Sequence, residues 1–237
     1  MTQPFRRGAL LYESSIWQGL KVQYAEDRIV ARLDQPLQTV SSAVYGGGLS
    51  TADGFVNWKV PLHYNCSDPV GDVGRMLEQW NLSTSATVGL LTAAKLTHAS
   101  IAESEGDCFT VFCMATSGTG NAARSGMIRE VFPAYSPGTI NIILFIDGRM
   151  TPSAMVNAVI TATEAKTAAL LDIGIKDHAN GRGATGTTTD AVVIGASQSE
   201  RYGALHAYAG AATTIGNLIG RVVYETVYES TSTQGEL

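Results

Sequence analysis

The order of apolar runs along this chain constrains its fold more than any other feature of the sequence. Short runs typical of β-strands outnumber the helical patterns, and the two kinds do not alternate one for one. Strands are expected at 20–24, 28–33, 39–45, 55–62, 87–93, 108–114, 140–146 and 191–194. This order favours an α+β fold in which a mostly antiparallel sheet, or sheets, pack against two or three long helices.

Three segments have the apolar spacing of helices, and two of them begin with a recognisable cap. Asp68 precedes Pro69, and Thr151 precedes Pro152. In each pair the first side chain can cap a helix, and the proline fits the first helical turn. We therefore expect helices over 68–81, 151–172 and 207–228. No internal repeat or linker is visible, which predicts a single domain over 1–237 with a frayed tail at 230–237.

Charge and hydropathy argue against several classes of function. The net charge is −5, and no basic cluster exceeds Arg6-Arg7, whereas a protein that binds nucleic acid needs a basic face. The longest apolar run, 140–146, is far too short to span a bilayer, and residues 1–11 lack the apolar segment of a secretion signal. We expect a cytoplasmic protein with no nucleic-acid partner and no membrane span.

The sequence predicts neither a metal site nor a nucleotide cofactor. The cysteines are too widely spaced for a zinc knuckle or a disulfide framework, and Cys108 and Cys113 are expected to be buried thiols. Gly118-Thr119-Gly120 followed by Ala123 matches a loose dinucleotide pattern, but 124–133 is too short and broken to supply the long helix that this pattern requires. The histidines lack the helical spacing of zinc ligands: His63, His98, His178 and His206.

Charged side chains in the Ala/Thr-rich segment 162–169 form the first candidate site. Charges among small, closely packed side chains are costly unless they are paired or functional. Glu164 and Lys166 lie about 200° apart around a helix, so they cannot both face one site. Thr163 and Lys166 share a face, with a spacing similar to the Ser-x-x-Lys pair of some amide-bond enzymes. From spacing alone, a surface charge plus a structural ion pair explains these residues equally well.

The loop 184–191 contains the densest group of polar side chains, in the order Ala-Thr-Gly-Thr-Thr-Thr-Asp-Ala. Its backbone N–H groups and hydroxyls suit a developing oxyanion or the amide substituents of a substrate. Asp190 can act as a base there, or it can simply hold the loop by bonds to the backbone. A second candidate is the run of Gly46, Gly47 and Gly48, which indicates a flexible corner or a close approach of the backbone to another group.

Taken together, these segments resemble the adenosylcobinamide amidohydrolase family. The resemblance spans about residues 40–222 and is most specific in the segment 163–170 followed by the loop 185–190. The other matching runs are Ser41-Ser42-Ala43, Gly46-Gly47-Gly48-Leu49, Asn57 before Val60, Leu91-Thr92-Ala93-Ala94, 118–122 around Asn121, Pro137-Gly138-Thr139-Ile140-Asn141 and 210–220.

The resemblance implies hydrolysis of adenosylcobinamide to adenosylcobyric acid and aminopropanol, a step that returns scavenged corrinoid to cobalamin biosynthesis. Cobalt then enters only as part of the substrate, and the protein itself needs no cofactor. The resemblance supplies no mechanism, so the roles of individual residues are our own hypotheses. An amide hydrolase must activate water or a nucleophile, stabilise an oxyanion and protonate the leaving amine.

We assign a role to each candidate from its chemistry. Asp190 or Glu164 is the candidate base, and Lys166 is the acid or the group that lowers its partner's pKa. The candidate oxyanion donors are Thr187, Thr189 and Asn121. The corrin periphery carries mostly amides, so asparagines suit substrate binding; the candidates for that role are Asn57, Asn141, Ser42, Gly46, Gly47, Gly48, Thr185 and Gly186.

Two other functions stay open at this point. The same scaffold suits a non-catalytic corrinoid-binding or carrier protein. Met114-Ala115-Thr116-Ser117 is similar to the processing site of amidases that free an internal threonine as an N-terminal nucleophile, here by cleavage before Thr116. The sequence does not set the oligomeric state, so a homo-oligomer also stays open, and it sets neither the upper-ligand preference nor whether complete cobalamins are cleaved.

Overall fold

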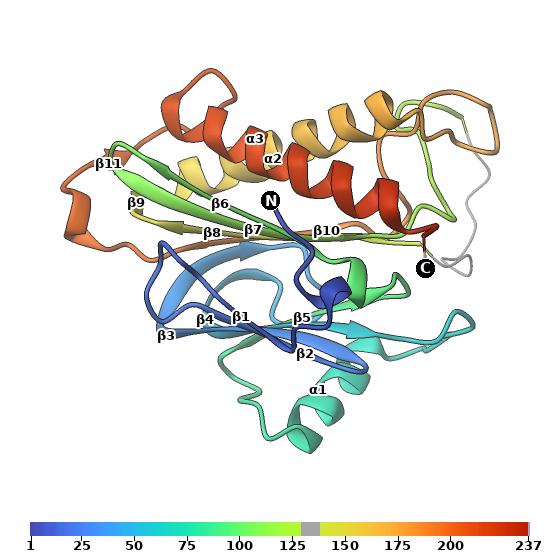
Figure 1. Cartoon of the computed structure of the whole chain (residues 1–237), viewed down its shortest axis with the longest axis horizontal. Helices are drawn as coiled ribbons and strands as arrows, with labels where there is room; N and C mark the ends of the chain where they lie inside the picture. Colours follow the sequence, from blue (N-terminus) through green and yellow to red (C-terminus); the bar gives the residue numbers. More distant parts are fainter. Residues whose placement is uncertain (129–137, 237) are drawn as a thin grey trace.

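Strand β3 (Arg28–Ser41) joins the two halves of one curled sheet. The computed structural model describes residues 1–128 and 138–236, and Figure 1 shows their arrangement. The first part of β3 pairs with β2 (Lys21–Ala25), and its last residues pair with β10 (Ala191–Ala196). The register along β4 (Gly48–Lys59) shifts between Arg32 and Leu37, where β3 passes from one half to the other. Irregularities of this kind bend a strand and increase its twist.

The sheet is mixed but mostly antiparallel. In the described residues its strand order is β1-β2-β3-β10-β8-β7-β6, and β4 pairs with both β3 and β5. The parallel pairs of this sheet are β10 with β8 and β4 with β5. The expected α+β class is confirmed. The remaining strands of the sheet are β1 (Leu11–Glu13), β5 (Thr87–Thr92), β6 (Ser100–Gly106), β7 (Phe109–Ser117) and β8 (Ile140–Asp147).

The helices cover the two outer faces of the folded sheet (Figure 1). Helices α2 (Pro152–Ile173) and α3 (Thr214–Thr233) lie side by side on the half made of β6, β7, β8 and β10, and α1 (Pro69–Gln79) lies against the other half. Two short strands and three single turns of 3-10 helix complete the described elements: β9 (Arg149–Met150), β11 (Leu205–His206), Phe5–Arg7, Leu96–His98 and Glu200–Tyr202.

Three apolar clusters fill the spaces between these layers. The first lies between α2, α3 and the sheet, and it includes Leu144 and Ile219. The second lies between the two halves of the sheet, where the rings of Phe55 and Phe145 are 4.5 Å apart. The third packs α1 against β3 and β4 through Leu77. Burial of this apolar surface drives the folding of the sheet on itself.

The helix caps follow the sequence signals. The side chain of Asp68 accepts a hydrogen bond from the Gly71 N–H, and Thr151 accepts one from the Ala154 N–H. Gly174 ends α2 in the left-handed region, with φ +84°, where glycine carries no steric penalty. The expected starts of the first two helices are therefore confirmed.

The prediction for the last helix was wrong at both ends. The helix begins at Thr214, after a cap by Thr213 on the Gly216 N–H, rather than near residue 207. It runs to Thr233, so residues 230–233 are not frayed: Ser230 and Thr231 are buried, and the hydroxyls of Thr231 and Ser117 are 2.7 Å apart. Polar side chains therefore hold the final turns against β7.

The strand predictions also needed correction. Residues 98–107, expected as a polar connection, contain β6, an edge strand whose polar side chains hide its alternation; the Ser100 hydroxyl donates to Glu229 of α3. The runs expected at 28–33 and 39–45 form the single strand β3, which ends at Ser41. The strand expected at 55–62 begins at Gly48 and ends at Lys59.

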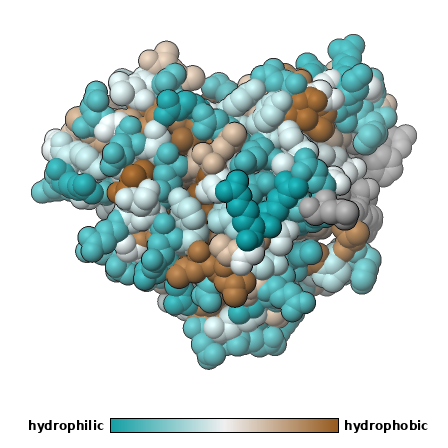
Figure 2. All heavy atoms as spheres, viewed as in Figure 1, coloured by the Kyte–Doolittle hydropathy of each residue, from teal (hydrophilic) through white to brown (hydrophobic). Residues whose placement is uncertain are grey.

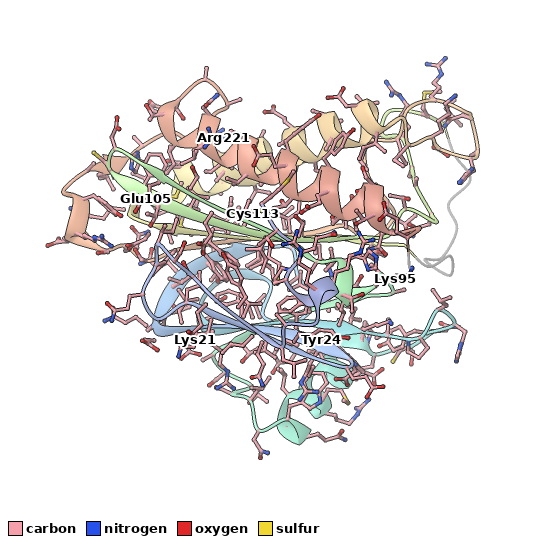
Figure 3. All side chains as sticks on the ribbon, viewed as in Figure 1. Lys21, Tyr24, Lys95, Glu105, Cys113 and Arg221 are labelled. Carbon is pink, nitrogen blue, oxygen red and sulfur yellow. The ribbon has the colours of Figure 1, made fainter. Side chains whose placement is uncertain are left out.

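Surface and interior differ as the sequence indicated. Figure 2 shows hydrophilic residues over most of one face, with apolar side chains in small patches. Cys113 lies between the sheet and α3 (Figure 3), with its sulfur 3.2 Å from the Thr226 hydroxyl, and burial raises the pKa of its thiol to about 12. Cys108 is only partly buried. No helix in the described ranges is long and apolar enough to cross a membrane.

Two neighbouring leucines of α2 test this packing. Leu170 is 0% exposed and belongs to the cluster beneath the helices, whereas Leu171 is 44% exposed. Leu170→Ala should lower the free energy of unfolding by about 2–5 kcal/mol, because it opens a cavity in a packed core. Leu171→Ala should cost less than about 1 kcal/mol. Urea unfolding of both variants measures the difference, and equal losses would contradict the placement of α2.

Candidate functional site

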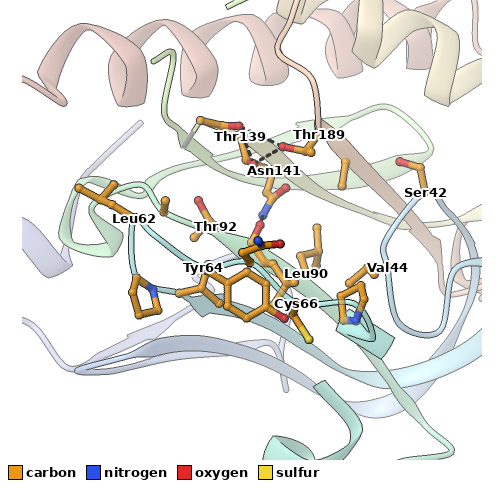
Figure 4. Close-up of a pocket in the computed structure, with 18 residues that line it drawn as sticks. Ser42, Val44, Leu62, Tyr64, Cys66, Leu90, Thr92, Thr139, Asn141 and Thr189 are labelled. Atoms are coloured by element: carbon orange, nitrogen blue, oxygen red, sulfur yellow. Dashed lines mark hydrogen bonds between the residues drawn. The ribbon is translucent and has the colours of Figure 1, made fainter. Parts of the chain in front are cut away.

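A cavity of about 620 Å³ lies between the two halves of the sheet, where β8 and β10 begin and β5 ends (Figure 4). Its size is typical of pockets that bind small molecules. Apolar side chains form much of the wall, and a few polar groups converge on it. The lining residues are Ser42, Val44, Val60, Pro61, Leu62, Tyr64, Asn65, Cys66, Pro69, Leu90, Leu91, Thr92, Ala93, Gly138, Thr139, Asn141, Thr189 and Ala191.

Two threonine hydroxyls meet in the wall of the cavity (Figure 4). The Oγ1 atoms of Thr139 and Thr189 are 2.6 Å apart. Both hydroxyls also lie within hydrogen-bond distance of the Gly138 carbonyl oxygen, at 2.8 Å and 3.0 Å. Thr139 precedes β8 and Thr189 precedes β10, so the parallel pairing of these strands brings the two side chains together.

A chain of buried polar side chains leads inward from the cavity. The side chain of Asn141 donates through Nδ2 to the Asn57 Oδ1 at 2.9 Å and to the Leu91 carbonyl oxygen at 2.8 Å. Asn57 donates in turn to the Thr116 hydroxyl at 2.8 Å. Asn141 lines the cavity, whereas Asn57 and Thr116 lie behind it in β4 and β7. The network thus links four strands: β4, β5, β7 and β8.

A buried ion pair supports the wall that contains Thr139 and Thr189. The Lys166 ammonium of α2 contacts the Asp190 carboxylate, and their side chains are only 8% and 12% exposed. Asp190 also accepts from the Ile140 N–H at 3.0 Å, from the Thr187 N–H at 3.0 Å and from the Thr187 hydroxyl at 2.5 Å. Four donors thus hold this carboxylate, and it fixes α2, the loop and the start of β8 to one another.

The ion pair explains why residue 186 of the loop is a glycine. A Cβ at Gly186 would lie 2.7 Å from the Lys166 Nζ and would clash with the Asp190 carboxylate. The backbone must therefore approach the pair closely, which only glycine allows. Gly186 also accepts a hydrogen bond from the Ala123 N–H, and the Thr185 Oγ1 accepts one from the Ser125 N–H. Both residues position the loop and neither lines the cavity.

At the α1 side of the cavity, Tyr64 is held by a carboxylate. Its hydroxyl donates to the Asp72 Oδ2 at 2.8 Å. Burial and the bonds to Asp72 and Cys66 raise the pKa of Tyr64, so the phenol stays protonated. Hydrogen bonds from Cys66 and then Tyr64, together with Arg75, lower the pKa of Asp72. This side of the cavity therefore presents a neutral hydroxyl held in place by a charged neighbour.

The structure brings some of the predicted site residues together and leaves others apart. Asn141, Thr189 and Ser42 line the cavity, and the Ser42 hydroxyl accepts from the Val192 N–H at 3.0 Å. Lys166, Asp190 and Thr187 lie directly behind the wall. Asn121 donates to the Thr188 hydroxyl and is in close contact with Gly138, so it too supports the wall.

Other candidate residues lie away from the cavity. Glu164 is exposed on α2, away from the buried Lys166, and does not line the cavity. Thr163 does not share the environment of Lys166 either: it is exposed and donates to the Val159 carbonyl. Two of the three glycines at 46–48 pack against protein backbone: a Cβ at Gly46 would lie 2.7 Å from the Thr87 carbonyl oxygen, and one at Gly47 would clash with Ala43. Gly48 has open space at its Cβ position and a φ of +86°, and none of the three lines the cavity.

The remaining motifs are placed as follows. Thr116 is buried in β7, paired with Asn141 of β8. The segment after Gly118-Thr119-Gly120 contains no helix up to residue 128, and the rest of 124–133 lies outside the described residues. Within the described ranges, no group of three or more His, Cys, Asp or Glu side chains is arranged to hold a metal ion.

Sequence reasoning missed several polar groups of the cavity. Thr139 belonged to a matching run but was not selected, although its position two residues before Asn141 puts both on one side of the strand. Thr92 and Tyr64 line the cavity from β5 and from the connection to α1. The signal that could have found them is their position at strand ends that meet in the curled sheet, which requires knowledge of the strand order.

Comparisons with known proteins give a consistent result. The model of a family described as adenosylcobinamide amidohydrolase matches residues 13–237. A Methanosarcina mazei protein named adenosylcobinamide amidohydrolase is 31% identical over 196 residues, which cover 80% of this chain and 88% of that protein. An uncharacterized protein of Methanocaldococcus jannaschii is 28% identical over 215 residues, which cover 80% and 83%.

Similarity to solved structures is weaker. A β-aminopeptidase of a Burkholderia species covers 86% of this chain and 77% of its own, with a TM-score of 0.44 and 14% identity. A similarity at this level supports no inference about activity.

The carboxylates Asp190 and Glu164 offer a matched test of the ion pair. Asp190→Asn should lower the free energy of unfolding by about 3–5 kcal/mol, because it leaves the buried Lys166 ammonium without a counter-charge. Glu164→Gln, the same chemical change at an exposed position, should stay within about 0.5 kcal/mol of the parent. Adding Lys166→Met to Asp190→Asn should recover much of the loss. Urea unfolding measures all three, and a fully stable Asp190→Asn protein would contradict the role of the pair.

Proposed function

Because the chain belongs to the adenosylcobinamide amidohydrolase family, we propose that it hydrolyses the amide between aminopropanol and the corrinoid of adenosylcobinamide. The products are adenosylcobyric acid and aminopropanol. The single observation that carries the proposal is the family match over residues 13–237, and the cavity supplies a place for the reaction. The cobalt ion belongs to the substrate, and the reaction as proposed uses no resident cofactor.

The cavity offers groups suited to amide hydrolysis. We assign the Thr139–Thr189 hydroxyl pair to the carbonyl oxygen of the scissile amide, which becomes an oxyanion when water adds to the carbon. Water supplies the oxygen of the new carboxyl group, and one of its protons goes to the leaving amine nitrogen as the C–N bond breaks. The other proton leaves when the carboxylic acid ionises to the carboxylate. Asn141 and Ser42, which line the same cavity, bind substrate in this proposal.

Lys166 and Asp190 act on the reaction through the wall they support. Asp190 already accepts four hydrogen bonds, so it is committed to holding Thr187 and Ile140 in place. We therefore assign the pair, with Thr187, Thr185 and Gly186, to positioning Thr139 and Thr189 rather than to proton transfer. This assignment replaces our expectation, from the sequence, that Asp190 is the general base.

In the cell the proposed reaction would return scavenged corrinoid to cobalamin biosynthesis. The proposed compartment is the cytoplasm, where that biosynthesis would use the product. A corrinoid carrier would bind the same ligand in the same cavity without breaking a bond, so product analysis separates the two functions.

Purified protein should release aminopropanol from adenosylcobinamide and leave adenosylcobyric acid. Mass spectrometry of both products after incubation tests the activity, and a sample pretreated with chelator should react at the same rate, because the proposed chemistry uses no resident metal. Binding of the corrinoid without aminopropanol release would favour the carrier instead.

Intact-protein mass spectrometry of the same sample should show one species of about 25 kDa, whereas two fragments separated before Thr116 would favour self-processing.

Threonine variants test the oxyanion assignment. Thr139→Val and Thr189→Val should each lower kcat by about 10²–10³, the usual effect of removing one oxyanion donor. The control is Thr163→Val on α2, since Thr163 is exposed and does not line the cavity; its kcat should change little. Melting temperatures identify variants that lose activity through instability. If Thr139→Val and Thr163→Val are equally active, the hydroxyl pair does not contact the reacting carbonyl.

A further inference from the structure

The orientation of the Asn141 side-chain amide is fixed by a neighbour that can only accept. The Leu91 carbonyl oxygen lies 2.8 Å from the Asn141 Nδ2. Reversing the amide would place the Asn141 Oδ1 against this carbonyl oxygen, with no hydrogen between two acceptors. Asn141 therefore directs its Nδ2 toward Leu91 and Asn57, and its Oδ1 in the other direction.

The Oδ1 of Asn141 is a buried acceptor that the described fold does not use. The side chain is 1% exposed, and its Oδ1 has no hydrogen-bond partner within the described residues. An unsatisfied buried acceptor is costly, and such groups are usually explained by a ligand or by function. Since Asn141 lines the cavity, a molecule bound there would lie next to this side chain and could supply the missing N–H or O–H donor.

The Thr139–Thr189 pair has the opposite polarity. Two hydroxyls share one protein acceptor, the Gly138 carbonyl oxygen, so only one of their two hydrogens is needed for it. The other hydrogen can turn from the neighbouring hydroxyl to a ligand. The pair can thus donate to a carbonyl oxygen while it keeps its bond to the backbone.

The two residues that supply the donor and the acceptor are one repeat of an extended strand apart. Thr139 and Asn141 are two residues apart, which corresponds to about 6.7 Å along a strand, and their side chains lie on the same side. The carbonyl oxygen and the N–H of a trans amide point in opposite directions, so an amide that lies along this wall can present one to each of two neighbouring positions. Figure 4 shows the threonine pair and Asn141 side by side on the cavity wall.

We propose that the cavity recognises a secondary amide at both ends, with the Thr139–Thr189 pair on its carbonyl oxygen and the Asn141 Oδ1 on its N–H. The proposal rests on the proposed amide hydrolysis and names the specificity-determining group for that reaction. Asn57 and Thr116 are positioning residues, because they contact Asn141 or Asn57 and not the cavity. Their buried bonds keep the Asn141 acceptor facing the ligand.

This arrangement distinguishes the substrate from its product. Hydrolysis replaces the N–H group by a carboxylate oxygen, which is only an acceptor. The carboxylate then faces the Asn141 Oδ1, and two acceptors cannot share a hydrogen bond. The same contact that binds the amide therefore disfavours the acid, which promotes product release.

An ester analogue isolates the proposed contact. In the ester of adenosylcobyric acid with propane-1,2-diol, an oxygen replaces the amide N–H and the rest of the molecule is unchanged. The quantity of interest is kcat/KM for the amide divided by kcat/KM for the ester, because the greater intrinsic reactivity of the ester cancels when two enzymes are compared. Asn141→Leu should lower this ratio by about 10- to 100-fold, since only the amide loses a hydrogen bond to a buried acceptor.

Thr116 provides the control for positioning. Thr116→Val removes the acceptor for Asn57 and should lower the amide-to-ester ratio part of the way, whereas Thr116→Ser keeps the hydroxyl and should restore it. A purely structural role would lower the melting temperature of Thr116→Val and leave the ratio unchanged, and that result would overturn the positioning role.

Failure of the inference is distinguishable from failure of the proposed function. If the parent protein hydrolyses neither compound, the proposed function fails, and the dissociation constants of the two corrinoids, from equilibrium dialysis, take the place of kcat/KM in the same ratio. If Asn141→Leu loses activity equally toward amide and ester, the ratio stays at the parent value and the inference is overturned. A parent protein that binds neither compound would also overturn it. A ratio that falls only in Asn141→Leu and Thr116→Val supports it.

Discussion

The contact between Lys166 and Asp190 holds together the parts from which the cavity is built. It joins a helix, a loop and the first residue of β8 inside the protein, where removing two charges from water is expensive. The cost is offset by the mutual attraction of the charges and by the three further donors on Asp190. A buried pair of this kind adds little net stability, but it allows only one arrangement of its partners. Here that arrangement places Thr139 beside Thr189.

Much of the architecture followed from local sequence signals, and the failures share one cause. The sequence predicted the capped helix starts at Asp68 and Thr151 and the apolar run of β8, because each is determined by a few adjacent residues. Strand β6 and the end of α3 were not, because Ser100 and Thr231 are polar residues whose partners lie far away in sequence, on α3 and β7. Only tertiary structure shows that their hydroxyls are satisfied.

The candidate site was partly predictable for the same reason. Lys166 and the Thr/Gly loop were conspicuous as charges and hydroxyls in a chain with few charged residues, and the helical period correctly separated Glu164 from Lys166. The function of each group was not predictable. Asp190 was a candidate base, yet four donors occupy it, and Gly46 and Gly47, expected near substrate, pack against backbone. The residue type shows which reactions a side chain can take part in. Whether its atoms are free to do so depends on the hydrogen bonds made by its neighbours in the fold.

The network from Asn141 to Thr116 shows how one set of contacts serves both folding and recognition. Asn57 and Thr116 lie in the apolar space between β4, β7 and β8, where polar groups require partners. In a network with only a structural role, every buried donor and acceptor would form a hydrogen bond with another group of the protein. Within the described residues, this network leaves the Asn141 Oδ1 without a hydrogen-bond partner, on the residue that lines the cavity. Since rotation of any member would break buried bonds, the direction of that acceptor is as rigid as the sheet itself, and the cavity presents a preorganised hydrogen-bonding group before any ligand arrives.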